Sequence, residues 1–126
     1  MKRAKAAEQI PPVELAILNI LWDYGPLSVQ EVQAKLGGES AYTTVQTTLN
    51  TMEKKGRTKR TLQGRAYVYK AAVARDVAMK SALRDLVDRM FSGSVESLVM
   101  NLLESERVDD KTFERLQALI AKRGQL

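Results

Sequence analysis

The sequence contains no cysteine and no histidine in its 126 residues. Without them, the chain has no disulfide, and it lacks the ligands of zinc fingers and of other thiolate or imidazole metal sites. The commonest general base and the cysteine nucleophile are missing as well. The remaining acidic pair, Asp109 and Asp110, fits the start of a helix better than a catalytic site. We therefore predict no metal, no cofactor and no enzymatic activity.

Long apolar runs are also missing. A membrane helix needs about 20 consecutive apolar residues, and no segment approaches that length. The basic start, MKRAKAAEQIPP, has no apolar centre and so does not resemble a secretory signal. With 44% hydrophobic and 28% charged residues, the composition is that of an ordinary globular protein. We expect a cytoplasmic protein with no membrane partner.

Charge is distributed unevenly along the chain. Residues 1–73 hold 11 basic and 6 acidic side chains, whereas residues 74–126 hold 9 of each, so the whole formal charge of +5 lies in the first part. A basic part joined to a neutral part suggests one surface for a polyanion and another for a protein partner. We predict two domains with these bounds.

Apolar periodicity predicts three helices in the first part, at about 11–24, 28–36 and 41–55. Ser28 and Glu31 match a capping box at the second start, and Ser40 is expected to cap the third. Gly56 is expected to end the third helix in the left-handed conformation. The buried stripe of the first helix is predicted to contain Val13, Ile17, Ile20, Leu21 and Tyr24.

The third helix has an unusual outer face. Its buried stripe is Val45, Leu49 and Met52, and the opposite side carries short polar residues. Threonine and asparagine are poor helix formers, and a merely solvated face would favour Glu, Lys and Ala. The alternative is a weak helix held by tertiary packing. We interpret the outer face as a surface that reads base edges, with these candidate residues: Thr43, Thr44, Gln46, Thr47 and Asn50.

A basic hairpin is predicted to follow. Between Lys54 and Arg75 there are eight basic residues and no acidic one. Residues 58–62 and 66–70 alternate as two strands, with one face expected to pack on the helices and the other to carry cations. Three helices and a hairpin make a winged helix. The residues expected to contact DNA phosphates are Thr51, Lys54, Lys55, Lys59, Arg60, Arg65 and Tyr67.

Residues 74–126 are predicted to form three amphipathic helices, with caps at Ser94 and Asp109. Such a short segment cannot close much of a core alone, so its apolar faces must pack on the winged helix or on a second copy. We favour a second copy, because DNA-reading proteins of this size commonly bind two half-sites. The predicted dimerisation residues are Leu86, Met90, Val95, Leu98, Val99, Leu102, Leu103 and Leu116.

Several motifs together resemble one known family, the penicillinase and methicillin-resistance repressors (BlaI/MecI). They are ELAILNILW at 14–22, GPLSVQEV at 25–32, YTTV at 42–45, GRAYVY at 64–69, and the C-terminal GSV and SLVMN at 93–95 and 97–101. The resemblance covers residues 10 to about 122. It implies a homodimeric transcriptional repressor on a palindromic operator. In resistance-regulating members, a sensor-protease pathway cuts the dimerisation helix after an asparagine, which corresponds here to the bond between Asn101 and Leu102.

The chain departs from that family at several positions. Leu102 stands where the resistance repressors have phenylalanine, and Thr51 replaces a usual arginine. Arg57 and Thr58 replace an apolar pair, which we expect to weaken packing and add surface charge. The cysteines of the copper-responsive branch are missing, which excludes copper sensing of that type.

Two alternatives stay open. The chain could be a winged-helix subunit that binds an acidic protein, or a repressor released by a small ligand.

Overall fold

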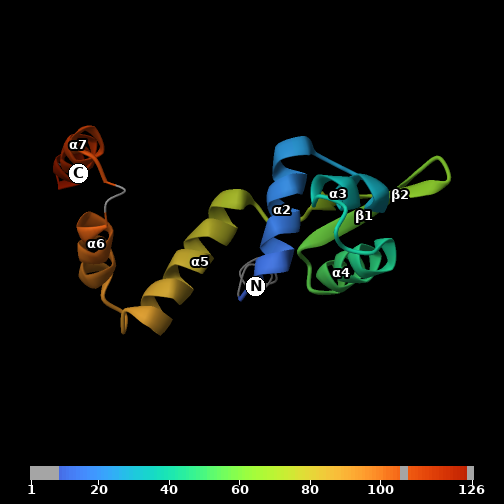
Figure 1. The fold of residues 1–126 in the computed structure, drawn as a ribbon, viewed down its shortest axis with the longest axis horizontal. Coiled ribbons are helices and arrows are strands. Elements are labelled where there is room, and N and C mark those ends of the chain that lie inside the picture. Colours follow the sequence, from blue (N-terminus) through green and yellow to red (C-terminus); the bar gives the residue numbers. More distant parts are fainter. Residues whose placement is uncertain (1–8, 106–107, 125–126) are drawn as a thin grey trace. The chain divides into compact units, whose positions relative to one another are not determined.

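The computed structural model describes residues 9–105 and 108–124. The chain divides into two compact units, Met1–Asp85 and Leu86–Leu126, here called the N-terminal and the C-terminal unit. The order of elements, labelled in Figure 1, is α2 (Pro12–Tyr24), α3 (Val29–Lys35), α4 (Tyr42–Lys54), β1 (Thr58–Gln63), β2 (Ala66–Ala71), α5 (Arg75–Met90), α6 (Val95–Glu104) and α7 (Asp110–Gly124).

Helix α2 supplies much of the core of the N-terminal unit. It begins after Pro11 and ends at Gly25, whose φ of +80° suits a residue without a Cβ. Ile17 and Leu21 are buried as the apolar spacing predicts, and Ile20 is partly buried against them. Leu18, outside the predicted stripe, is buried as well. The prediction was wrong for Val13 and Tyr24, which are exposed. Both lie in the end turns of α2, beyond the part of the helix that packs on its neighbours.

The capping box at the start of α3 is confirmed. The Ser28 hydroxyl accepts a hydrogen bond from the Glu31 amide, and the Glu31 carboxylate accepts one from the Ser28 amide. These bonds to the charged form lower the pKa of Glu31. The expected cap of α4 was wrong. Its first flanking residue is Ala41, with no side-chain cap, while the Ser40 carbonyl accepts a hydrogen bond from the Gln33 side chain.

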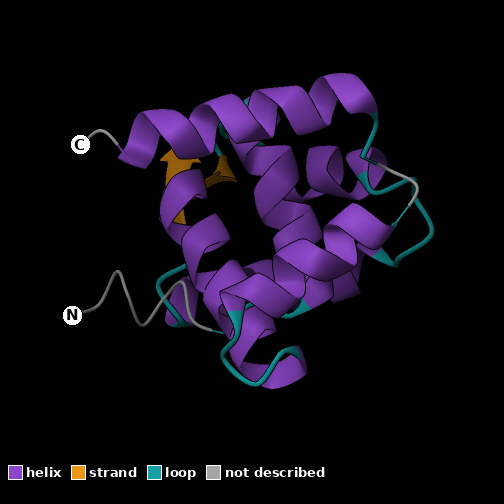
Figure 2. Ribbon diagram, turned by 90° about the vertical axis from the view of Figure 1, so that its left-hand side faces the viewer, coloured by secondary structure: helices purple, strands orange, loops and turns teal. Residues whose placement is uncertain are grey.

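Strands β1 and β2 form an antiparallel hairpin in which Thr58 pairs with Ala71 and Gln63 with Ala66. The turn is therefore Gly64-Arg65, and Gly64 has a φ of +62°. A third segment extends the pairing, because Leu27 and Tyr69 exchange both backbone hydrogen bonds, at 2.9 and 2.7 Å. Figure 2 shows the two strands of this small sheet in orange. Three helices followed by a hairpin make a winged helix.

A buried ion pair joins α2 to the segment that links α4 to β1. Arg57 Nη1 lies 2.6 Å from Glu14 Oε1, and both residues are 5% exposed. Lys55 Nζ lies 3.1 Å from the other carboxylate oxygen. The expectation that Arg57 and Thr58 loosen packing and add surface charge was wrong. Both residues are buried, and the Thr58 hydroxyl donates to the Leu49 carbonyl.

The C-terminal helices begin as the sequence predicts. The Ser94 hydroxyl accepts from the Ser97 amide, and the Asp109 carboxylate accepts from the Thr112 amide. The boundary between the units differs from the expected one, because it falls inside α5 rather than before it. The first half of α5 belongs to the N-terminal unit, since Ala78 is in its core and Asp85 accepts a hydrogen bond from the Gln9 amide. In the part of the chain that the structure describes, no helix is long and apolar enough to span a bilayer.

The buried pair generates a prediction on stability. Glu14→Gln keeps the side-chain shape but leaves the buried Arg57 cation opposite a neutral amide. Breaking a buried pair in this way costs about 3–5 kcal/mol, so the free energy of unfolding in urea is expected to fall by that amount. Lys55→Met is the matched control, because its side chain is partly exposed and should change stability by less than about 1 kcal/mol. Equal effects of the two substitutions would contradict the role given to burial.

Candidate nucleic-acid interface

The outer face of α4 is open to solvent where the sequence predicts a base-reading surface. Val45, Leu49 and Met52 point into the core. Because these residues occupy one side of the helix, the hydroxyl- and amide-bearing side chains occupy the other. The exposed members of the predicted base-reading set are Thr43, Thr44, Gln46 and Thr47.

Asn50 differs from the other members of this set. Its side chain is half-buried, and Oδ1 accepts a hydrogen bond of 2.5 Å from the Tyr69 hydroxyl. Tyr69 lies on β2, so this bond connects the polar face of α4 to the hairpin. No spacing within the sequence predicts the contact, because the two residues are 19 positions apart.

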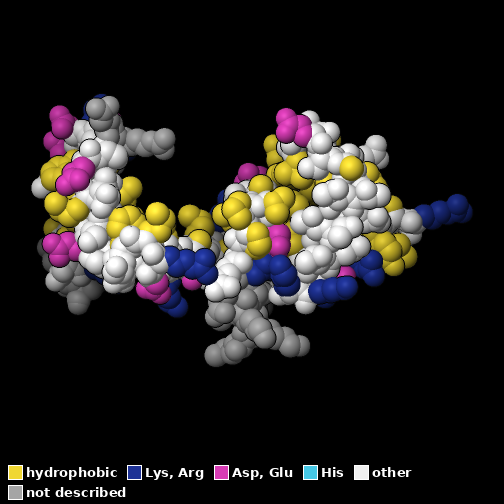
Figure 3. Space-filling model, turned by 60° about the horizontal axis from the view of Figure 1, so that its bottom comes forward, with side chains coloured by type: hydrophobic (Ala, Val, Ile, Leu, Met, Phe, Trp, Pro, Cys, Tyr) yellow, Lys and Arg dark blue, Asp and Glu magenta, His cyan; other side chains and the backbone are white. Residues whose placement is uncertain are grey.

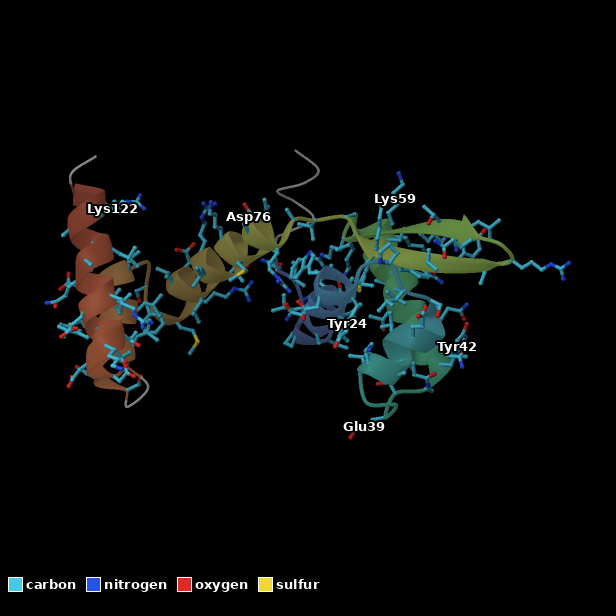
Figure 4. The ribbon with its side chains drawn as sticks, turned by 90° about the horizontal axis from the view of Figure 1, so that it is seen from above. Tyr24, Glu39, Tyr42, Lys59, Asp76 and Lys122 are labelled. Carbon is cyan, nitrogen blue, oxygen red and sulfur yellow. The ribbon has the colours of Figure 1, made fainter. Side chains whose placement is uncertain are left out.

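The hairpin carries cations on both faces, which corrects the expectation that one face packs and the other is basic. Residues directly opposite in an antiparallel pair share a face. Arg60 pairs with the buried Tyr69, and Lys59 pairs with Lys70. Arg60 therefore lies on the face of Tyr69, whereas Lys59 lies on the other face. Figure 4 shows Lys59 extending from the hairpin, and Arg65 lies in the turn.

Several of the basic side chains between Lys54 and Arg75 form ion pairs with carboxylates on α2 or α4. Glu14 pairs with Lys55 and Arg57, Glu53 with Arg60 at 3.4 Å, and Asp23 with Arg75 at 2.6 Å. Within residues 9–105 and 108–124, no ion pair engages the other members of this basic stretch, Lys54, Lys59, Arg65 and Lys70. Figure 3 shows Lys and Arg side chains along one side of the N-terminal unit.

Arg60 is held by three neighbours at once. Its backbone amide donates to Glu53 Oε2 at 2.8 Å, and its guanidinium lies 4.5 Å from the centre of the Tyr67 ring. The hydrogen bond to the Tyr69 hydroxyl is the main cause that raises the pKa of Arg60. Arg60 thus links α4 to both strands. Of the predicted phosphate set, Thr51, Lys54 and Tyr67 are exposed as well.

A cleft that the sequence does not mark lies between α2 and the start of α5. It has a volume of about 330 Å³ and is lined by Trp22, Val77 and the segment 71–74. The Trp22 indole N–H already donates to the Val73 carbonyl at 2.9 Å. The lining therefore lacks the polar side chains that orient a small molecule in a binding pocket, and it does not favour ligand-controlled release.

The predicted dimerisation residues lie on open faces of the C-terminal helices. Leu98 is half-buried, and the other members of the set are exposed. Neither α6 nor α7 has a buried residue. In the C-terminal unit, Figure 3 shows hydrophobic side chains at the surface. Asn101, at the predicted cleavage position, is exposed in α6, and its amide donates to the Ser97 carbonyl.

Comparison with known proteins identifies the family. The model of the penicillinase repressor family matches residues 10–122. The chain belongs to this family. It is 25% identical to the penicillinase repressor of Bacillus licheniformis over 118 residues. This alignment covers 92% of each chain. It is also 25% identical over 115 residues to the penicillinase repressor of Staphylococcus aureus, covering 89% of this chain and 90% of that one.

Structural similarity agrees with the fold. A complex structure of hsRosR-S4 superposes with a TM-score of 0.53 at 16% identity, covering 99% of this chain and 97% of that one. The family and the winged-helix fold are those of DNA-binding transcriptional repressors rather than of enzymes.

The pattern of ion pairs predicts how salt affects DNA binding. Arg65→Ala should weaken binding to every duplex and reduce the log-log salt slope by about 0.9, because an unpaired cation that contacts a phosphate releases a counterion. Lys55→Ala removes the same charge from the same segment, but Glu14 already neutralises that lysine. Its slope should change much less.

The measurement is a titration of a labelled duplex at several salt concentrations with each variant. An unchanged slope for Arg65→Ala would remove Arg65 from the phosphate-binding set. Equal changes in the two variants would show that Lys55 leaves Glu14 when DNA binds.

Proposed function

We propose that the protein is a dimeric, sequence-specific repressor that binds a palindromic DNA operator in the cytoplasm through α4 and the hairpin. The observation that carries this proposal is the exposed threonine and glutamine face of α4, together with hairpin cations that pair with no carboxylate among the described residues, in a chain of a repressor family. Short hydroxyl and amide groups can reach base edges, and free cations attract phosphates.

In this proposal α4 enters the major groove. Gln46 pairs with an adenine edge, and Thr43, Thr44 and Thr47 contact thymine methyl groups or phosphates. A good bidentate pair contributes about 1–3 kcal/mol of discrimination. Arg65 and Lys54 supply attraction that does not depend on sequence, with Lys59, Arg60, Tyr67 and Thr51 at the edge of the contact.

The apolar faces of the C-terminal helices support a dimer. Val95, Leu98, Val99, Leu102 and Leu103 follow helical spacing along α6, and α7 leaves Ile120 70% exposed. A self-complementary face on two identical chains closes into a symmetric pair, and this symmetry matches a palindromic operator. We therefore assign the C-terminal unit, including Leu86, Met90 and Leu116, to dimerisation and the N-terminal unit to DNA reading.

Proteolysis between Asn101 and Leu102 would end repression in this scheme. The bond lies in the last turns of α6, which ends at Glu104. A helical bond does not have the extended backbone that proteases bind, so the end of α6 must open before a regulatory protease can cut it. Cleavage would separate α7 and the last apolar residues of α6 from the rest of the interface.

The dimer makes a testable prediction for operator architecture. Duplexes selected from a random pool by the native protein should contain an inverted repeat, with half-site centres about 34–36 Å apart or a multiple of that distance. Val99→Asp places a charge in the apolar face, so it should sediment as a monomer and select single half-sites with lower affinity.

Asp88→Ala is the matched control, because Asp88 is an exposed residue of α5. This variant should form dimers and select the same inverted repeat as the native protein. A native protein that remains monomeric at micromolar concentration would contradict the dimer. Binding without sequence preference would instead indicate an architectural role, and no binding to duplexes would favour a protein-interaction subunit.

The cleavage scheme is tested by placing the recognition sequence of a site-specific protease at the Asn101–Leu102 bond. Cutting should convert dimers to monomers and weaken operator binding by at least about tenfold, because the second half-site is lost. The same sequence inserted in the loop at 92–94 gives a control for nicking between helices. Full operator affinity after complete cutting at 101–102 would exclude this mechanism of release.

A further inference from the structure

The amide of Asn50 is held by the hairpin in one orientation. Tyr69, which donates its hydroxyl proton to Asn50 Oδ1 at 2.5 Å, is 2% exposed. Both backbone hydrogen-bonding groups of Tyr69 are bonded to Leu27. Neither the ring nor its hydroxyl can therefore move without disturbing the core, so the amide oxygen of Asn50 has a fixed partner.

The hydrogen bond runs from the Tyr69 hydroxyl, which is the donor, to Asn50 Oδ1, which is the acceptor. Arg60 is directly opposite Tyr69 in the hairpin and lies on the same face. Glu53 holds Arg60 in place through the backbone bond of 2.8 Å and the side-chain pair of 3.4 Å. Glu53 and Asn50, both on α4, are therefore connected through Arg60 and Tyr69 of the hairpin.

One lone pair of the Asn50 oxygen accepts from the buried Tyr69 hydroxyl, so the oxygen side of the amide faces the hairpin. The NH₂ group keeps both of its donors free of a partner among the described residues, and it is the more available part of the amide for a ligand. Adenine is read by asparagine through two bonds, and one of them needs the amide oxygen as an acceptor from the adenine N6 amino group. Guanine instead presents two acceptors, O6 and N7, in the major groove. An amide that offers its NH₂ group fits a guanine edge better than an adenine edge.

We propose that Tyr69 is a positioning residue that turns the Asn50 NH₂ group toward the major groove, so that Asn50 selects guanine at one operator position. The proposal rests on the proposed function, in which α4 enters that groove. It gives Asn50 a different base from the adenine proposed for Gln46. It also makes a buried residue of the hairpin a determinant of base specificity.

The test is selection of bound duplexes from a random pool by the native dimer and by single variants. The native protein should select guanine at one position of each half-site. Asn50→Ala and Tyr69→Phe should both reduce that preference by about tenfold and leave the other positions unchanged. Tyr24→Phe is the matched control, because it removes a tyrosine hydroxyl outside the proposed interface, keeps the ring beside Lys35 and should keep the native preference.

A second variant keeps the proposal testable if Tyr69→Phe does not fold. Asn50→Asp still accepts a hydrogen bond from the Tyr69 hydroxyl but presents an acceptor in place of the NH₂ group. Its preference at the same position should change from guanine to a base with an amino group, cytosine or adenine.

Three results would overturn the inference. Tyr69→Phe could lower affinity equally for all sequences, which is the effect of a purely structural residue. The position that depends on Asn50 could select adenine in the native protein, or Asn50→Asp could keep guanine. A native protein that binds no duplex fails at an earlier step, because that result removes the proposed function itself.

Discussion

The carboxylate of Glu14 fixes the position of the hairpin relative to α4. It anchors the segment between these elements to α2 through Arg57, which is buried with it. The backbone of Arg57 is used at both ends, since its amide donates to Met52 in α4 and its carbonyl accepts from Ala72 beyond β2. Two buried charges are stable only as a pair. The hairpin therefore begins at a fixed point and direction, and the contacts between Tyr69 and Asn50 depend on that placement.

Local features of the fold could be predicted from the sequence because their causes are local. The capping box at Ser28, the caps at Ser94 and Asp109, and the glycine turns depend on residues a few positions apart. The bounds of the strands agree with the alternation to within one residue. The cap at Ser40 could not be excluded from the sequence, since its carbonyl is bound by Gln33, on the preceding helix.

The candidate site was only partly predictable for the same reason. Exposure of Thr43, Gln46 and Thr47 follows from the apolar stripe on the opposite side of α4. The ion pairs of Lys55 and Arg57 do not follow from the sequence pattern, because their partner Glu14 lies more than 40 positions away. The pair of Arg60 with Glu53 does not follow either, because it joins the end of α4 to β1 across the segment that links them. A run of basic residues in a sequence overstates the charge that a polyanion meets. The sequence of one chain also does not identify what covers the apolar faces of the C-terminal helices.

The carboxylates that hold the hairpin also bear on how such a protein would search a genome. Adhesion to random chromosomal DNA grows with the number of unneutralised cations on the contacting surface. When Arg60 and the neighbouring Lys55 and Arg57 are paired with internal carboxylates, the hairpin region slides and detaches more readily than its composition suggests. Occupancy would then depend more on recognition of the right bases and less on the potassium concentration of the cell.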